Sequence, residues 1–260
     1  MLLVMVLLLA LTLAGCTRQR DPAQMSDDDQ IAYYTEQISK TEDAYLYYNR
    51  GQTYFRKQQY DLAIADYTQA IERSYTKSQV AVSTEKVILQ RANAYSNRGN
   101  AYDQKGQSDF AFADYSKAIE LNPKDKEAYS NRGNIYDTRG QYDLALADYN
   151  KAIELDSNNP YAYSNRGNTY NNKGQFDLAI ADCTRARELD PNFVQAYVNR
   201  GNAYYGKQQY DLALADYNKA IELNPQNPAA YNNRGYLYKQ KGEDGLAKAD
   251  FDKAAELGKR

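Results

Sequence analysis

The chain has 260 residues, of which 25% are charged, and its formal net charge is -2. Because no basic excess is available to neutralise phosphates, the composition disfavours a nucleic-acid partner. Histidine is absent, which removes the commonest general base and the commonest transition-metal ligand. Tyrosine is frequent, with 27 Tyr against 6 Phe and no Trp, and this indicates one aromatic residue used in many equivalent places.

The start of the chain has the features of a secretion signal. Residues 1–13 are apolar except for Thr12, and Leu13-Ala14-Gly15-Cys16 follows. A membrane-spanning helix needs about 20 apolar residues, whereas a short apolar run that ends in small residues is typical of a signal peptide. Leu-Ala-Gly-Cys also resembles the lipobox of bacterial lipoproteins, which implies a lipoprotein signal peptide at 1–15 and lipidation, palmitate included, at Cys16. The alternative is an apolar start to a buried helix.

A polar segment follows the cysteine. Residues 16–40 are predicted to be a lipidated tether and linker, because Thr17 to Gln30 is polar and contains a proline. Thr17, rather than an aspartate, stands next to the cysteine. The lipoprotein resemblance therefore implies a cell-envelope protein with a lipid anchor in the outer membrane, facing the periplasm.

The rest of the chain is built from internal repeats. Asn-Arg-Gly recurs, with its glycines at Gly51, Gly99, Gly133, Gly167, Gly201 and Gly235. The last five glycines are 34 residues apart and the first gap is 48 residues, so an insertion lies after the first copy. With each glycine numbered position 8 of its copy, positions 4 and 11 are always Tyr, and positions 20 and 27 are always Ala.

This series of aromatic, Gly, Tyr and Ala residues resembles the tetratricopeptide repeat (TPR) family, whose unit is a helix-turn-helix of 34 residues. The resemblance implies an all-α fold, a right-handed α-solenoid of six TPR repeats, over residues 41–258. The packing physics agrees, since Gly and Ala let two helices approach closely while large tyrosines fill the remaining space. The predicted repeats are 44–77, 92–125, 126–159, 160–193, 194–227 and 228–260, with an insertion at 78–91 that is apolar enough to lengthen a helix.

Each copy also carries a pair of opposite charges, with Arg at position 7 and Asp at position 23. The constant offset predicts a ladder of ion pairs between the two helices, within or between repeats. Its central members are Arg98, Arg132, Arg166, Arg200, Asp114, Asp148, Asp182 and Asp216. The alternative is that the arginines bind a partner.

In the TPR family, positions 2, 5, 6, 9, 12 and 13 line a concave groove, where asparagine can hold the backbone of a bound peptide. The predicted partner-binding residues are Asn49, Asn97, Asn100, Asn131, Asn134, Asn165, Asn168, Asn199, Asn202 and Asn233. The alternative is that these asparagines are a consensus kept by duplication. Asp103, Glu127 and Asp137 make the second and third repeats acidic, which favours a basic or neutral ligand.

No catalytic chemistry is predicted. Cys183 stands at position 24, where other copies have Tyr or Phe, and without a histidine to activate it we expect a buried structural thiol. Phosphate-loop, zinc-protease and serine-hydrolase motifs do not occur, so no enzyme activity, metal or cofactor is expected.

The predicted function is a membrane-tethered scaffold for other envelope proteins or extended peptides. The alternatives are a type IV pilus pilotin-like assembly factor and a self-assembling structural lipoprotein. A homodimer is also considered. The array ends with its last helix B at residues 257–258 without a capping helix, and a second subunit would cover this final face.

Overall fold

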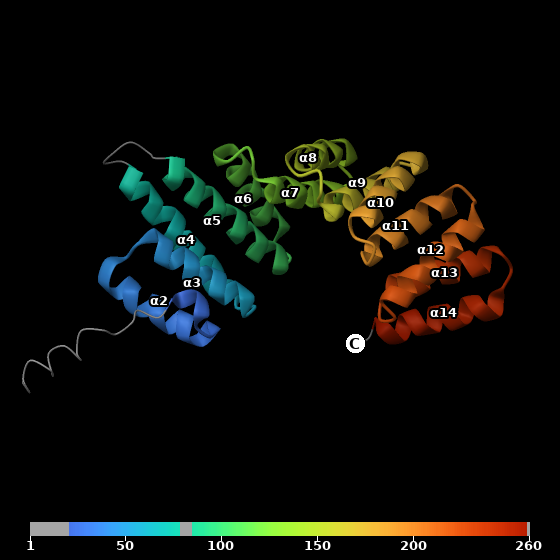
Figure 1. Ribbon diagram of the computed structural model, residues 1–260, viewed down its shortest axis with the longest axis horizontal. Coiled ribbons are helices and arrows are strands. Elements are labelled where there is room, and N and C mark those ends of the chain that lie inside the picture. Colours follow the sequence, from blue (N-terminus) through green and yellow to red (C-terminus); the bar gives the residue numbers. More distant parts are fainter. Residues whose placement is uncertain (1–20, 79–84, 259–260) are drawn as a thin grey trace, which may run out of the picture. The chain divides into compact units, whose positions relative to one another are not determined.

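The structure is a computed structural model that describes residues 21–78 and 85–258. In these ranges every regular element is a helix: a short 3-10 helix, η1 (Pro22–Gln24), precedes thirteen α-helices. The α-helices are α2 (Asp27–Thr41), α3 (Ala44–Arg56), α4 (Tyr60–Ser78), α5 (Glu85–Gln104), α6 (Ser108–Leu121), α7 (Lys126–Thr138), α8 (Tyr142–Leu155), α9 (Pro160–Asn172), α10 (Phe176–Leu189), α11 (Val194–Gly206), α12 (Tyr210–Leu223), α13 (Pro228–Gln240) and α14 (Asp244–Leu257) (Figure 1). The predicted signal peptide and Cys16 lie outside the described residues.

The chain divides into two compact units, Met1–Gln107 and Ser108–Arg260. The first unit contains α2 to α5, and the second contains α6 to α14. Within the units, neighbouring helices pack as hairpins: α3 with α4, α7 with α8, α9 with α10, α11 with α12, and α13 with α14. We call the first helix of each repeat helix A (α3, α5, α7, α9, α11, α13) and the second helix B (α4, α6, α8, α10, α12, α14). The all-α fold made of helical hairpins is the predicted one.

The turn between helix A and helix B requires a left-handed residue at position 15. Gly140 and Gly174 take this conformation with a φ of 69°, and the amide of Gln141 then donates to the carbonyl of Tyr136 at 2.9 Å. This bond closes the end of the helix as in a Schellman motif. In the first and fifth repeats Gln58 and Gln208 occupy the same place at φ 58° and 60°, where a side chain is strained.

Helices A and B touch most closely at position 8. A Cβ atom on Gly133 would lie 2.9 Å from Cε1 of Tyr149, and one on Gly201 would lie 2.6 Å from Cε1 of Tyr217. The ring at position 24 therefore lies directly on the glycine backbone. Because Tyr149 and Tyr217 are at most 2% exposed, this contact is the centre of the hairpin core.

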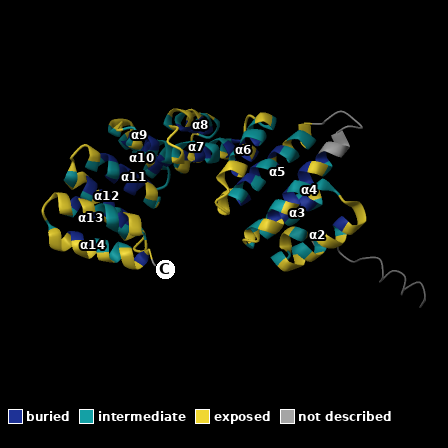
Figure 2. Cartoon of the chain, turned by 180° about the vertical axis from the view of Figure 1, so that it is seen from behind, coloured by how far each residue is buried: buried dark blue, intermediate teal, exposed yellow. Residues whose placement is uncertain are grey.

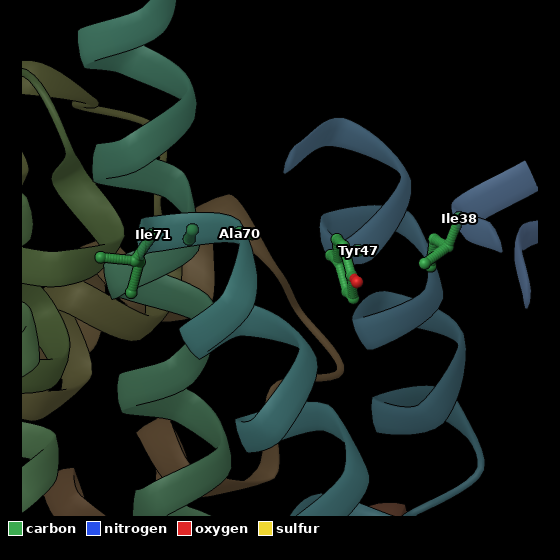
Figure 3. Packing of buried hydrophobic residues seen from close by; sticks show 5 residues of the cluster. Ile38, Tyr47, Ala70 and Ile71 are labelled. Carbon is green, nitrogen blue, oxygen red and sulfur yellow. The ribbon is translucent and has the colours of Figure 1, made fainter. Parts of the chain in front are cut away.

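The core of the first unit joins four helices. Ile38 of α2, Tyr47 of α3, and Ala70 and Ile71 of α4 form one buried cluster together with Ala94 of α5. Figure 3 shows Tyr47 between Ile38 on one side and Ala70 on the other. Figure 2 shows the alternation of buried and exposed positions that results along each helix.

The prediction of a linker over residues 16–40 is wrong for its second half, because α2 begins at Asp27. Ser26 caps this helix and accepts a hydrogen bond from the amide of Asp29 at 3.2 Å. The polar side chains that suggested a solvated tether bind α3 instead. Lys57 forms an ion pair with Asp28 at 2.6 Å, and Arg56 forms one with Asp27 at 2.7 Å.

Helix α2 takes the place of a helix B from a preceding repeat. The Nη1 atom of Arg50 donates to Thr35 of α2 at 2.9 Å, just as Arg132 donates to Ser116 of the preceding helix B at 3.3 Å. If Thr35 is numbered position 25, Asp28 falls at position 18, and this position of helix B pairs with the residue at position 14 of the next helix A throughout the chain. Helix α2 is therefore a half-repeat that covers the apolar face of α3.

The predicted insertion at 78–91 is described only in part. Helix α4 continues to Ser78, residues 79–84 lie outside the described residues, and residues 85–91 form the first turns of α5. Helix α5 thus begins ahead of the repeat boundary at residue 92.

Candidate functional site

The arginine at position 7 binds the aspartate at position 23 of its own repeat. Arg132 donates through Nε and Nη2 to the two carboxylate oxygens of Asp148, both at 2.8 Å. The same bidentate pairs are Arg50 with Asp66, Arg166 with Asp182, Arg200 with Asp216, and Arg234 with Asp250. Arg98 and Asp114 belong to different compact units, and their pairing stays a prediction.

The third guanidinium nitrogen of these arginines, Nη1, links neighbouring repeats. Nη1 of Arg166 donates to Asn150 of the preceding helix B at 2.6 Å, and Arg98 donates in the same way to Thr68 at 2.9 Å. The group also lies 5.6 Å from the ring centroid of Tyr163 and 6.0 Å from that of Tyr170. The hydrogen bond to Asp182 raises the pKa of Arg166. These bonds engage all three guanidinium nitrogens of Arg166 within the array, so the arginines hold neighbouring helices together.

The first unit contains two neighbouring cavities at positions of the predicted groove. A cavity of 690 Å³ lies along α2 and α3, with groove positions Tyr45, Asn49 and Gln52 in its lining. A second cavity, of 260 Å³, continues from Gln52 to Asn97 and Asn100 of α5. The two cavities share Gln52 and Arg56. Helices α2, α3 and α5 thus form one elongated site, which we call the first-unit groove.

The first-unit groove combines aromatic rings with amides. Tyr45 is 55% exposed, and Tyr33 and Tyr34 of α2 line the same cavity with their ring centroids 5.4 Å apart. The carboxamide of Asn49 makes no hydrogen bond to the described part of the chain, whereas Asn97 donates to the Tyr48 hydroxyl at 2.9 Å. Burial raises the pKa of Tyr34, so this hydroxyl stays a neutral donor.

Sequence reasoning missed Tyr33 and Tyr34 because it placed them in the linker. A signal was present: Ser26, followed three residues later by Asp29, is a capping pattern, and Ile31, Tyr34 and Ile38 recur at helical spacing. The charged residues that line the cavity at α2 are Asp21, Asp27 and Arg56, and Arg56 forms an ion pair with Asp27.

In the second unit the asparagines bind one another. Asn134 at position 9 accepts hydrogen bonds through Oδ1 from the Tyr149 hydroxyl at 2.7 Å and from Asn165 of the next helix A at 2.9 Å. Asn202 accepts in the same way from Tyr217 at 2.9 Å and from Asn233 at 2.8 Å. Of the predicted groove residues, Asn131 and Asn168 are partly exposed on the same helices.

We call the contact between the A helices of consecutive repeats a joint. The joint between α9 and α11 departs from this pattern. Asn199 is predicted to bind a partner, but it is only 2% exposed. Its amide donates to the backbone carbonyl of Ser164 at 3.1 Å, and Asn171 donates to the backbone carbonyl of Asn199 at 2.8 Å. Asn199 therefore cannot contact a partner, and its assignment to the groove is wrong.

The physical reason is the residue at position 24 of the fourth repeat. Cys183 replaces the tyrosine whose hydroxyl would bind the position 9 asparagine, and its thiol is fully buried. The smaller side chain lets α11 approach α9, and the rings of Tyr161 and Phe193 close the entrance with centroids 4.6 Å apart. Desolvation raises the pKa of the Cys183 thiol, as expected of an inert cysteine.

The remaining candidate residues are dispersed. Asp103 lies in the first unit, where partial desolvation raises its pKa although its side chain is exposed. Glu127 and Asp137 lie in the second unit, and Asp137 accepts a hydrogen bond from Thr169 at 2.7 Å. Among residues 21–78 and 85–258 no three Asp, Glu or Cys side chains are grouped as metal ligands.

No helix in the described part of the chain is both long and apolar enough to cross a membrane. The proposed lipid attachment at Cys16 is a separate question, because that residue lies outside the described residues.

The structure resembles several solved proteins. YrrB, described as a TPR protein with an unusual peptide-binding site, is 26% identical, and the match covers 76% of this chain and 95% of YrrB with a TM-score of 0.58. MamA is 28% identical, with 62% and 94% covered and a TM-score of 0.52. The C-terminal part of a TPR repeat-containing protein from Cytophaga hutchinsonii shares the fold at 21% identity, with 89% and 90% covered and a TM-score of 0.59. No curated protein gave a significant sequence match.

Family models match most of the repeat region. The tetratricopeptide repeat model matches residues 44–74, 92–125 and 160–193, and a TPR repeat model matches 133–174 and 201–242. Two further tetratricopeptide repeat models match 115–147 and 228–257. By its sequence and by its helical hairpins, the chain belongs to the tetratricopeptide repeat family.

Proposed function

We propose that this protein is a membrane-tethered scaffold that holds an extended segment of a partner protein in the first-unit groove. The observation that carries the proposal is the joined pair of cavities along α2, α3 and α5, lined by tyrosines and amides at the groove positions. Its similarity to YrrB, a TPR protein with a peptide-binding site, supports a peptide as ligand.

The chemistry of the groove limits the ligand. Amides such as Asn49 can pair with the backbone of an extended peptide irrespective of its side chains, and each such bond contributes only about 0.5–1.5 kcal/mol. The aromatic rings of Tyr33, Tyr34 and Tyr45 would supply most of the affinity by covering apolar or aromatic side chains. Because Arg56 is already paired with Asp27, we expect a neutral segment to bind better than an acidic one.

The ligand can be found by crosslinking and then measured by titration. A photo-crosslinking amino acid at position 45 would capture the partner in intact cells, and mass spectrometry would identify the captured segment. A synthetic peptide with the sequence of that segment is then used in the titration. We expect Tyr45→Ala with Asn49→Ala to weaken binding of that peptide at least tenfold.

The chain offers a matched control in the fourth repeat. Tyr161 and Asn165 occupy the same positions 2 and 6 in the fourth repeat, and Tyr161 is 60% exposed compared with 55% for Tyr45. Tyr161→Ala with Asn165→Ala should change the affinity less than twofold. Equal losses from the two double variants would mean that the peptide does not select the first-unit groove.

The membrane tether is proposed from the sequence Leu13-Ala14-Gly15-Cys16 and from the residues between Cys16 and α2, which could connect an outer-membrane anchor to the array. Cys16→Ser should abolish labelling by an alkyne analogue of palmitate and move the protein from the membrane to the soluble fraction. Unchanged labelling and fractionation would show that the protein has no lipid on this cysteine.

A further inference from the structure

The second unit carries a regular row of exposed apolar side chains on its B helices. Position 19 is Phe110, Leu144, Leu178, Leu212 and Leu246 in α6, α8, α10, α12 and α14, and these side chains are between 49% and 61% exposed. Position 22, one turn further along each helix, is an exposed alanine: Ala113, Ala147, Ala181, Ala215 and Ala249. A contiguous apolar surface of a few hundred Å² is a common mark of a protein interface.

The row is continuous because the same ion pair links each helix A of the second unit to the preceding helix B. Position 14 of each helix A forms an ion pair with Asp at position 18 of the preceding helix B. Arg139 binds Asp109 at 2.5 Å and Lys241 binds Asp211 at 3.4 Å, while Lys173 pairs with Asp143, and Lys207 with Asp177. The first turns of the B helices therefore follow one another along one edge, and the groove asparagines lie on the A helices instead.

Charges of opposite sign flank the apolar row. On one side are the aspartates at position 18, whose side chains are between 83% and 96% exposed. On the other side, position 26 is always basic: Lys117, Lys151, Arg185, Lys219 and Lys253. Each of these cations pairs with an exposed glutamate three residues later on its own helix. Helices α6, α8, α10 and α12 thus each present an acidic, an apolar, a small and a basic residue in that order, whereas α14 has Gly245 at position 18.

We propose that this face docks a second copy of the same chain, with the B helices of the two copies antiparallel. Positions 18 and 26 lie one helical turn on either side of position 22. An antiparallel approach centred on the alanines therefore places each Asp row opposite the basic row of the other copy, while the leucines fill the space between. Charge complementarity of a surface with itself is what a two-fold symmetric interface requires.

A second copy fits better than a lipid surface. Burying the leucines in hydrocarbon would also bring the aspartates at position 18 out of water, which is costly. In this arrangement the two-fold axis runs along the row of alanines, so each B helix faces its own mate and the alanines at position 22 lie nearest the axis. The row lies on α6 to α14 and shares no residue with the first-unit groove, so the two proposals can be tested separately.

The test is sedimentation velocity of the full chain over a series of concentrations, with Cys16→Ser so that acyl chains do not drive association. Leu144→Glu, Leu178→Glu and Leu212→Glu together should raise the dimer dissociation constant at least tenfold. Position 19 is the third residue of its helix, where glutamate favours the helix, so circular dichroism and the melting temperature should show an intact fold.

A matched control places the same charges outside the row. Gln141, Gln175 and Gln209 precede the same three helices, and their side chains make no capping bond. Changing all three to Glu should alter the dissociation constant less than twofold. By contrast, Lys151→Glu, Arg185→Glu and Lys219→Glu together should weaken the dimer at least tenfold, and the wild-type dimer should weaken as salt is added.

Three results would overturn the proposal: a monomer at every concentration, a dimer that the triple leucine variant leaves unchanged, or a dimer equally weakened by the glutamine control. The last measurement is binding of the chain to vesicles that contain phosphatidylglycerol. Leucine-dependent binding to these vesicles without dimer formation would assign the row to a membrane surface.

Discussion

Two joints in the second unit are built from nearly the same sequence but differ in their inner face. At the joint of α7 and α9, Tyr149 holds Asn134, and Asn165 of the next helix lies at the surface. At the joint of α9 and α11, Cys183 stands in the place of that tyrosine, and Asn199 is buried between the helices. The difference shows that one side chain in the hairpin core decides whether a groove position is available to a ligand.

Substitutions at position 24 should have the largest effect on the free energy of unfolding. Tyr149→Ala removes a ring that covers Gly133 and should lower the free energy of unfolding by about 3–5 kcal/mol, as for other buried aromatic residues. Cys183→Ala removes a single sulfur atom and should cost only about 1–2 kcal/mol. Urea unfolding monitored by circular dichroism measures both. Equal costs would show that the two cores are packed equally.

The arginine ladder is common to both joints, but its burial is not. Arg200 is 9% exposed as a residue, and its side chain is 11% exposed against 18% for Arg166. Removing one partner of a buried pair leaves an uncompensated charge, which costs roughly 3–5 kcal/mol. We expect about 3 kcal/mol for Arg200→Ala and a smaller loss for Arg166→Ala. Adding Asp216→Asn to Arg200→Ala should recover part of the loss, and no recovery would contradict direct pairing.

The two asparagines at position 6 provide the sharpest comparison. Asn199→Ala removes buried hydrogen bonds to the carbonyl and hydroxyl oxygens of Ser164, both at 3.1 Å, and should cost about 1–3 kcal/mol. Asn165→Ala removes a bond near the surface, where water can replace the donor, and should cost less than about 1 kcal/mol. Urea unfolding of the two variants under one set of conditions gives the difference. Equal losses would mean that the joint at α11 is as open as the joint at α9.

Alkaline pH should distinguish the cysteine from the tyrosine. Desolvation raises the folded-state pKa of both Cys183 and Tyr149, so the neutral forms are favoured in the folded chain. Stability is then full below the unfolded pKa and is lost as the pH rises past it, from about 8.5 for Cys and about 10 for Tyr. The loss is about 1.4 kcal/mol per pH unit for each group. Between pH 8.5 and 10 wild type should lose more stability than Cys183→Ala; identical slopes would contradict this.

Periodicity in the sequence was sufficient for the repeats but not for their departures. Gly133 and Tyr149 recur with the repeat, so their contact follows from the family pattern. The burial of Asn199 does not, since it depends on how far α11 moves when Cys183 is small, and this is a property of two helices together. The spacing of Arg and Asp predicted a pair but left open whether it forms within or between repeats.

Helix α2 and the apolar row were missed for different reasons. The first residues of α2 are polar, and polarity alone cannot distinguish a solvated tether from a helix whose charges bind a neighbour, as Asp28 binds Lys57. The leucine at position 19 fits the apolar period of a helix, so the sequence alone does not distinguish it from a core residue. Its exposure depends on the orientation of helix B in the hairpin, which only the structure gives.

The smallest expected effect concerns the turns between helix A and helix B in the fourth and fifth repeats. In the fourth repeat the left-handed position is Gly174 at φ 69°, whereas in the fifth it is Gln208 at φ 60°. A side chain in this conformation costs about 1–2 kcal/mol relative to glycine, part of which glycine loses again through its greater freedom in the unfolded chain. Gln208→Gly should therefore stabilise the protein by roughly 0.5–1 kcal/mol, and Gly174→Gln should destabilise it by a similar amount. Thermal melting of the two variants measures both signs, and a Gln208→Gly variant that melts below wild type would show that the glutamine side chain makes a contact that outweighs its backbone strain.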